Sequence, residues 1–79
     1  MTADRPETLD VRGFPCPQPI IDLSRRIGQL TAGAALIVLS DDPAFPLDLE
    51  AWCAGCGHDL LELKSEGRLH RALVRKAGP

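Results

Sequence analysis

The sequence predicts a two-layer α/β sandwich with the element order β-α-β-α-β-β, a mixed sheet and both helices on one face. Two long segments place apolar residues three or four positions apart, as amphipathic helices do. Shorter segments that alternate or are continuously apolar lie around them, as strands do. A glycine-containing turn joins the last two short segments into an antiparallel hairpin. Right-handed crossovers then place both helices on the same face of the sheet.

The first half of the chain predicts a strand, a helix and a second strand. Residues 8–11 alternate in polarity and include a β-branched valine, which is typical of a short strand. Apolar residues then recur at helical spacing, so we expect an amphipathic helix from about Pro17 to Leu30. Residues 35–39 form a continuous apolar run of strand length, which indicates a central strand.

The second half predicts a helix followed by the hairpin. Asp41 or Asp42 is placed to cap the start of this helix, because short acidic side chains accept hydrogen bonds from free backbone N–H groups. Residues 61–64 alternate as a strand, and residues 69–75 alternate again. The four residues between them form a tight turn, in which glycine supplies a positive φ.

Length and composition indicate one small globular domain. The chain has 79 residues, of which 44% are hydrophobic and 25% are charged. We expect a flexible N-terminus at 1–7, a single domain at 8–76 and a tail at 77–79. The longest apolar run is far too short to span a membrane, and the first residues lack the apolar core of a signal peptide. We therefore expect a cytoplasmic protein.

Cys16 is the main candidate for chemistry. It lies between two prolines, and both Pro17 and Pro19 are tolerated at the first positions of a helix. Cys16 then falls at or next to the N-cap, where the helix dipole and free N–H groups favour a thiolate and lower its pKa. Gly13 frees the backbone to turn toward Cys16. The alternative is a small apolar residue buried at a helix start, as free cysteine often is.

The position of Cys16 in the predicted sheet adds to this interpretation. Loops that follow parallel strands emerge at the same edge of a sheet, which is the usual functional edge of α/β proteins. Cys16 follows the first strand, whereas Asp41 and Asp42 follow the second. We therefore expect these three residues on one rim.

Two further cysteines invite a redox interpretation. Cys53 and Cys56 follow Trp52 in a Cys-x-x-Cys pattern, as in thioredoxin-like sites. A redox pair of that kind begins a helix, whereas this pair ends one, on the same face as Trp52. We expect both thiols to be buried, with a redox or resolving role and a metal site as the alternatives. His58 is the only nearby histidine, so we expect no metal and no cofactor.

The charges point to protein partners more than to nucleic acid. The net charge of −2 argues against nucleic-acid binding as the main task. The final hairpin is nevertheless basic, and such residues usually form a solvated strand face. The alternative is a docking surface for an acidic partner or RNA, made of Arg68, Arg71, Arg75 and Lys76.

The stretch around Cys16 resembles the signature of a known family. Residues 9–19 read LDVRGFPCPQP, which is similar to the Cys-Pro-x-Pro motif and its Leu-Asp-x-x-Gly lead in the TusA/SirA-like sulfur-carrier family. The resemblance covers about residues 8–76. It continues through Gly33, Asp42-Pro43, His58 and Gly67.

This resemblance implies a two-layer sandwich in which Cys16 carries a persulfide sulfur from a donor protein to an acceptor protein. It implies a cysteine desulfurase or rhodanese-type donor, and a relay that serves tRNA thiolation, sulfur oxidation or cofactor sulfuration. The protein would be a sulfurtransferase that acts as a carrier and not as an enzyme for small substrates. We expect supporting residues around the thiol at Gly13, Pro17, Pro19 and Asp42.

Two alternatives remain at this point. One is a thiol–disulfide redox protein that uses Cys53 and Cys56, and the other is a regulatory docking module in which Cys16 is structural. The exposure of each thiol separates them, because a carrier needs Cys16 exposed whereas a redox protein needs Cys53 exposed. Cys56 lies outside the family pattern, so its role stays open.

Overall fold

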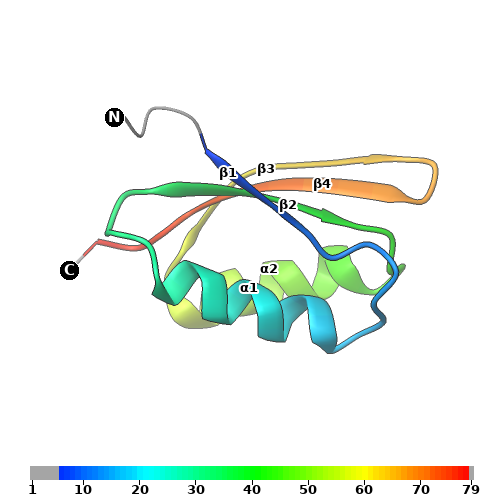
Figure 1. Ribbon diagram of the computed structural model, residues 1–79, viewed down its shortest axis with the longest axis horizontal. Helices are drawn as coiled ribbons and strands as arrows, with labels where there is room; N and C mark the ends of the chain where they lie inside the picture. Colours follow the sequence, from blue (N-terminus) through cyan, green and yellow to red (C-terminus); the bar gives the residue numbers. More distant parts are fainter. Residues whose placement is uncertain (1–5, 79) are drawn as a thin grey trace.

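The computed structural model describes residues 6–78 and confirms the predicted fold class. Two helices pack on one face of a four-stranded sheet, and both helices begin at the same end of the molecule (Figure 1). The predicted flexible segment 1–7 falls mostly on residues 1–5, which lie outside the described residues. The six elements are β1 (Glu7–Asp10), α1 (Gln18–Gly28), β2 (Ala35–Ser40), α2 (Phe45–Cys56), β3 (Asp59–Glu66) and β4 (Leu69–Arg75).

The sheet is mixed, with the strand order β1-β2-β4-β3. β1 pairs in parallel with β2, and β4 pairs antiparallel with both β2 and β3. β3 and β4 form the predicted hairpin, in which Gly67 has a φ of 61°. β3 begins at Asp59, two residues before the predicted start, and its register shifts between Leu60 and Glu62. A bulge breaks the alternation there, which is why the sequence pattern missed the first two residues of the strand.

The core lies between the sheet and the two helices. Alternate residues of β2 and β4 point into it, and the helices contribute residues at i, i+4 spacing. Each of these side chains is at most 4% exposed. The core consists of Val11, Leu23, Ile27, Leu36, Val38, Phe45, Leu49, Cys53, Ala72 and Val74.

The helix boundaries differ slightly from those predicted. α1 ends at Gly28 and not at Leu30, because the chain tightens into a turn after Ile27. Pro17 is the N-cap of α1 with φ −98° and ψ 10°, so it does not occupy the first helical position. Neither described helix is long and apolar enough to cross a membrane.

Three of the four basic residues predicted for the end of the chain, Arg71, Arg75 and Lys76, have partners within the protein. Arg71 forms an ion pair with Glu62 at 3.1 Å, and Arg75 pairs with Asp59 at 2.8 Å. Lys76 donates to the backbone oxygen of Leu30. Opposite charges facing each other across antiparallel strands stabilise the hairpin modestly, since the pairs are exposed.

Candidate functional site

The loops that follow β1 and β2 meet at one end of the molecule, as predicted. The backbone N–H of Gly13 donates to Oδ1 of Asp41 at 2.9 Å. Gly13 has a φ of 88°, a conformation in which glycine is favoured because it has no Cβ. A shallow hollow of about 210 Å³ lies between the two loops, lined by Gly13, Phe14, Pro15, Asp41, Asp42 and Pro43.

Cys16 lies on this rim as an exposed, free thiol. Its Sγ atom lies 2.9 Å from Oδ2 of Asp48, and the thiol donates to that carboxylate. Asp48 belongs to the first turn of α2, where the helix dipole favours an acidic side chain. The contact exists because both helices start at the same edge of the sheet (Figure 1). Sequence analysis did not identify Asp48 as a neighbour of Cys16.

The start of α1 does not offer the anion site that the sequence predicted. The N–H of Gln18 donates to the oxygen of Pro15 at 3.0 Å, and the N–H of Ile20 donates to the oxygen of Pro17 at 3.1 Å. Pro19 has no N–H at all. The first three residues of α1 therefore have no backbone donor free for a sulfur anion, and the prolines that mark the motif are part of the reason.

The expected lowering of the Cys16 pKa is also wrong, because Asp48 lies beside the thiol. The hydrogen bond to Asp48 raises the pKa of the Cys16 thiol, because it stabilises the protonated form. Partial desolvation and the negative charges of Asp48 and Asp42 raise it further. Free Cys16 is therefore held as a neutral thiol, and not as the thiolate that a bare helix terminus would favour.

Asp42 and the prolines support the rim by packing and backbone contacts. Neither Asp41 nor Asp42 caps α2 with its side chain, since the N-cap is Ala44. Instead, the backbone oxygen of Asp42 accepts from the N–H of Phe45 at 3.0 Å. The Oδ2 atom of Asp42 is buried and has no hydrogen-bond partner among the described residues. Pro19 is fully buried and fixes α1 against the sheet.

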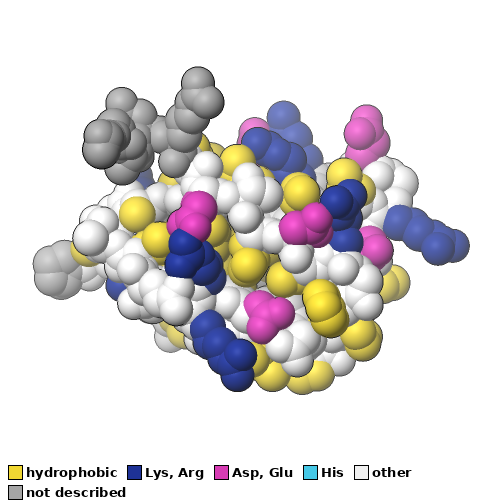
Figure 2. Space-filling view, viewed as in Figure 1, with side chains coloured by type: hydrophobic (Ala, Val, Ile, Leu, Met, Phe, Trp, Pro, Cys, Tyr) yellow, Lys and Arg dark blue, Asp and Glu magenta, His cyan; other side chains and the backbone are white. Residues whose placement is uncertain are grey.

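Exposed apolar side chains lie in the thiol loop and in the first turns of both helices. Phe14 is 49% exposed, Ile21 is 40% exposed and Leu47 is 74% exposed. Phe14 and Ile21 flank Cys16 in the chain, and Leu47 is next to Asp48. Figure 2 shows hydrophobic side chains over the β1–α1 loop and the start of α1. Large apolar side chains left exposed in a cluster are typical of a surface that contacts another protein.

The other two cysteines differ from each other. Cys53 is 4% exposed, as predicted, and desolvation raises its pKa to about 11. Cys56 is exposed, which contradicts the predicted burial. It is the last residue of α2, directly before the left-handed C-cap Gly57. A thiol–disulfide site needs an accessible thiolate, so the burial of Cys53 argues against the redox alternative.

Both histidines contact other residues of the protein. The ring of His58 lies 5.0 Å from that of Trp52, which is half-buried and not fully enclosed in the core. The backbone N–H of Ala77 donates to Nδ1 of His58 at 2.9 Å. His70 packs on Phe45 and contacts the Ser65 hydroxyl at 2.6 Å through Nδ1. Among residues 6–78, no cluster of three or more histidine, cysteine or acidic side chains is arranged to hold a metal ion.

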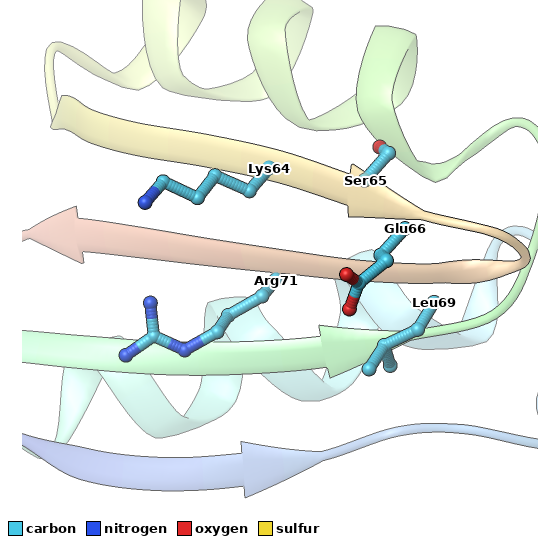
Figure 3. A pocket seen from close by; sticks show the side chains of 5 residues that line it. All are labelled: Lys64, Ser65, Glu66, Leu69 and Arg71. Atoms are coloured by element: carbon cyan, nitrogen blue, oxygen red, sulfur yellow. The ribbon is translucent and has the colours of Figure 1, made fainter.

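A larger hollow lies at the β3–β4 hairpin, away from the thiol. Its volume is about 370 Å³, and most of its side chains project from the sheet face that lies opposite the helices (Figure 3). None of its lining residues belongs to the loop that carries Cys16. They are Lys64, Ser65, Glu66, Leu69 and Arg71.

The fold and the rim together define a small α/β domain that presents one exposed thiol beside an acidic side chain and an apolar surface. The profile of the family described as Sulfurtransferase TusA matches residues 7–76, and the chain belongs to this family. The predicted family resemblance is thereby confirmed.

Two relatives illustrate the match. The chain is 39% identical over 70 residues to the putative sulfur carrier protein YrkF of Bacillus subtilis; the match covers 89% of this chain and 38% of that protein's length. The crystal structure of a SirA-like protein from Desulfitobacterium hafniense superimposes with a TM-score of 0.76 at 26% identity. That superposition covers 91% of this chain and 97% of the other.

Proposed function

We propose that this protein is a sulfur carrier that accepts a sulfane sulfur on Cys16 and passes it to an acceptor protein. The observation that carries the proposal is the exposed Cys16 thiol on the rim of a TusA-family fold. A structural cysteine would be buried, and Cys16 is not. The exposed apolar side chains beside it give a docking partner a surface to bury.

Loading and delivery are two thiol exchanges of the same kind. The Cys16 thiolate attacks the terminal sulfur of a persulfide on the donor, a new S–S bond forms, and the donor cysteine leaves as a thiolate. In delivery, the acceptor's thiolate attacks the terminal sulfur on Cys16, and Cys16 leaves in turn. The sulfane sulfur keeps its oxidation state throughout, so neither exchange needs an external oxidant or reductant.

The donor that fits this chemistry is a cysteine desulfurase or a rhodanese-type protein, since both present sulfur as a cysteine persulfide. The downstream acceptor belongs to a relay for tRNA thiolation, sulfur oxidation or cofactor sulfuration. The protein's role is to carry sulfur between larger proteins. Its docking surface therefore matters more than a substrate pocket would.

Loading can be tested by intact-mass spectrometry with a desulfurase and cysteine. We expect a gain of one sulfur atom, about 32 Da, on the wild-type protein and none on Cys16→Ser. Cys56→Ser is the matched control, because Cys56 is also exposed but lies at the far end of α2. Loading of folded Cys16→Ser, or a folded wild-type protein that accepts sulfur from neither class of donor, would contradict the proposal.

A further inference from the structure

We propose that Asp48 makes Cys16 release its sulfur readily, because its carboxylate stabilises the unloaded thiol and repels the loaded persulfide anion. This inference rests on the proposed carrier function and assigns a role to a residue outside the Cys-Pro-x-Pro motif. Asp48 contacts the reacting sulfur directly, with 2.9 Å between Oδ2 and Sγ. The two charge states of Cys16 therefore meet the carboxylate in opposite ways.

The unloaded state gains from the contact. A neutral thiol donates a hydrogen bond to the Asp48 carboxylate, and a bond to a charged acceptor is stronger than one between neutral groups. The thiol keeps its proton because the hydrogen bond raises its pKa. The contact with the Asp48 carboxylate therefore stabilises unloaded Cys16 as a neutral thiol with a hydrogen-bond partner.

The loaded state loses that bond and gains a repulsion. A persulfide is a stronger acid than a thiol, so its terminal sulfur is anionic at neutral pH. An S–S bond is about 2 Å long, so the terminal sulfur stays within about 5 Å of Oδ2 whichever way it points from its place on Sγ. Two like charges at that range repel each other even when solvent reaches them.

The neighbouring charges do not cancel this repulsion. Asp42, in the loop between β2 and α2, adds a second negative charge that acts on Cys16. The basic residues of α1 lie in its last turn, at the other end of the helix. Arg12, the nearest cation in the chain, is paired with Asp10 at 2.7 Å. The first-turn N–H groups of α1 are already used by Pro15 and Pro17.

Delivery then relieves an unfavourable contact. The acceptor's thiolate attacks the terminal sulfur and forms the new S–S bond. The electron pair of the old bond goes to Sγ, which then takes a proton from water. The resulting thiol donates a hydrogen bond to the Asp48 carboxylate. Asp48 interacts more favourably with unloaded Cys16 than with loaded Cys16. This free-energy difference displaces the transfer equilibrium toward the acceptor. For unit charges about 4 Å apart in water, that difference is about fivefold.

Asp48→Asn tests the proposal, because asparagine keeps the shape and an acceptor oxygen but removes the charge. Each protein is equilibrated anaerobically at neutral pH with glutathione persulfide and glutathione, and the loaded fraction is measured by intact mass. We expect the loading equilibrium constant of Asp48→Asn to rise about fivefold. Glu50→Gln is the matched control, since it removes an exposed charge from the same helix away from Cys16, and its constant should stay within about twofold.

Two further measurements keep the result decisive. Added salt should shift the loading of the wild-type protein in the same direction as the substitution, since salt screens exposed charges. The pH midpoint for alkylation of Cys16 should fall in Asp48→Asn. If Asp48 had only a structural role, a variant with an unchanged circular dichroism spectrum would not show this fall. If Asp48→Asn does not fold, the salt dependence of the wild-type protein decides.

The outcomes separate this inference from the carrier function. If the wild-type protein loads on Cys16 and folded Asp48→Asn has the same loading constant, the role of Asp48 alone is overturned. The same follows if Asp48→Asn does not fold and salt leaves the wild-type constant unchanged. Weaker loading of folded Asp48→Asn overturns it as well. Wild-type protein that does not load, or that loads equally after Cys16→Ser, overturns both proposals together.

Discussion

The backbone N–H of Gly13 and the side chain of Asp41 form a hydrogen bond of 2.9 Å that joins two loops 28 residues apart in the chain. One loop leaves β1 and carries Cys16, whereas the other leaves β2 and leads to the first turn of α2. The bond therefore fixes the thiol loop against the segment that delivers Asp48. Gly13 donates this bond from a backbone with a φ of 88°, in the region that favours glycine.

Gly13→Ala should destabilise the protein by about 1–2 kcal/mol, the cost of placing an L-residue in the left-handed region. A Cβ at Gly13 would meet nothing within 4 Å, so the effect is conformational and not steric. Gly28→Ala is the matched control, because it is equally open but has no positive φ. Urea unfolding measures both. A Gly13→Ala midpoint at or above that of Gly28→Ala would show that the loop tolerates another conformation.

The sequence predicts the fold well because each element carries a local signal. The apolar run of β2, the helical spacing in α1 and the glycine turn before β4 each determine their structure within a few residues. Only the boundaries shift. The start of β3 was missed because its register irregularity, between Leu60 and Glu62, breaks the alternation that identifies a strand.

The site could be predicted only in part, because its electrostatics depend on contacts between distant segments. The rim position of Cys16 follows from topology, so it was predictable. The contact with Asp48 joins residues 32 positions apart, and no local pattern encodes it. One signal was available, since α2 must start on the same rim as α1 and Asp48 lies in its first turn. The donors of α1 were misjudged because their use by Pro15 and Pro17 is a detail of the turn.

Phe45→Ala should destabilise the protein by about 3–5 kcal/mol, the usual range for a fully buried aromatic side chain. Phe45 is 1% exposed and belongs to the buried core. Trp52→Ala should cost about half as much, since Trp52 is half-buried and packs on His58 at the edge of the core. Denaturant midpoints compare the two variants directly. Equal losses would mean that the half-buried Trp52 contributes as much to stability as the fully buried Phe45.

Arg12→Ala should raise the pKa of Asp10 from about 2 toward the ordinary aspartate value of about 4. The side-chain hydrogen bonds from Arg12 are the main cause of the low value. Because the folded pKa lies below the unfolded one, the stabilisation is present above about pH 4 and is lost as the pH falls toward 2. Titration of the Asp10 carboxyl by NMR measures the shift. Arg68→Ala serves as the control, and an unchanged Asp10 pKa in Arg12→Ala would contradict the assignment.

Cys53 and Cys56 should react very differently with a thiol reagent in the folded protein. Cys56 is exposed and should be alkylated rapidly at pH 8, whereas Cys53 is buried. With a pKa of about 11, only about one Cys53 side chain in a thousand is a thiolate at pH 8, and burial blocks the reagent in addition. Both thiols should react at similar rates in urea, where neither constraint remains.

The same difference decides the redox alternative. In Cys16→Ser, which leaves only Cys53 and Cys56, a mild oxidant such as diamide should produce no intramolecular disulfide while the protein stays folded. Forming one requires Cys53 to leave the core, so its rate should rise steeply with urea. Peptide mapping after alkylation counts the remaining thiols. Rapid loss of both thiols in the folded variant would show that this pair is accessible, and would restore a redox role for the end of α2.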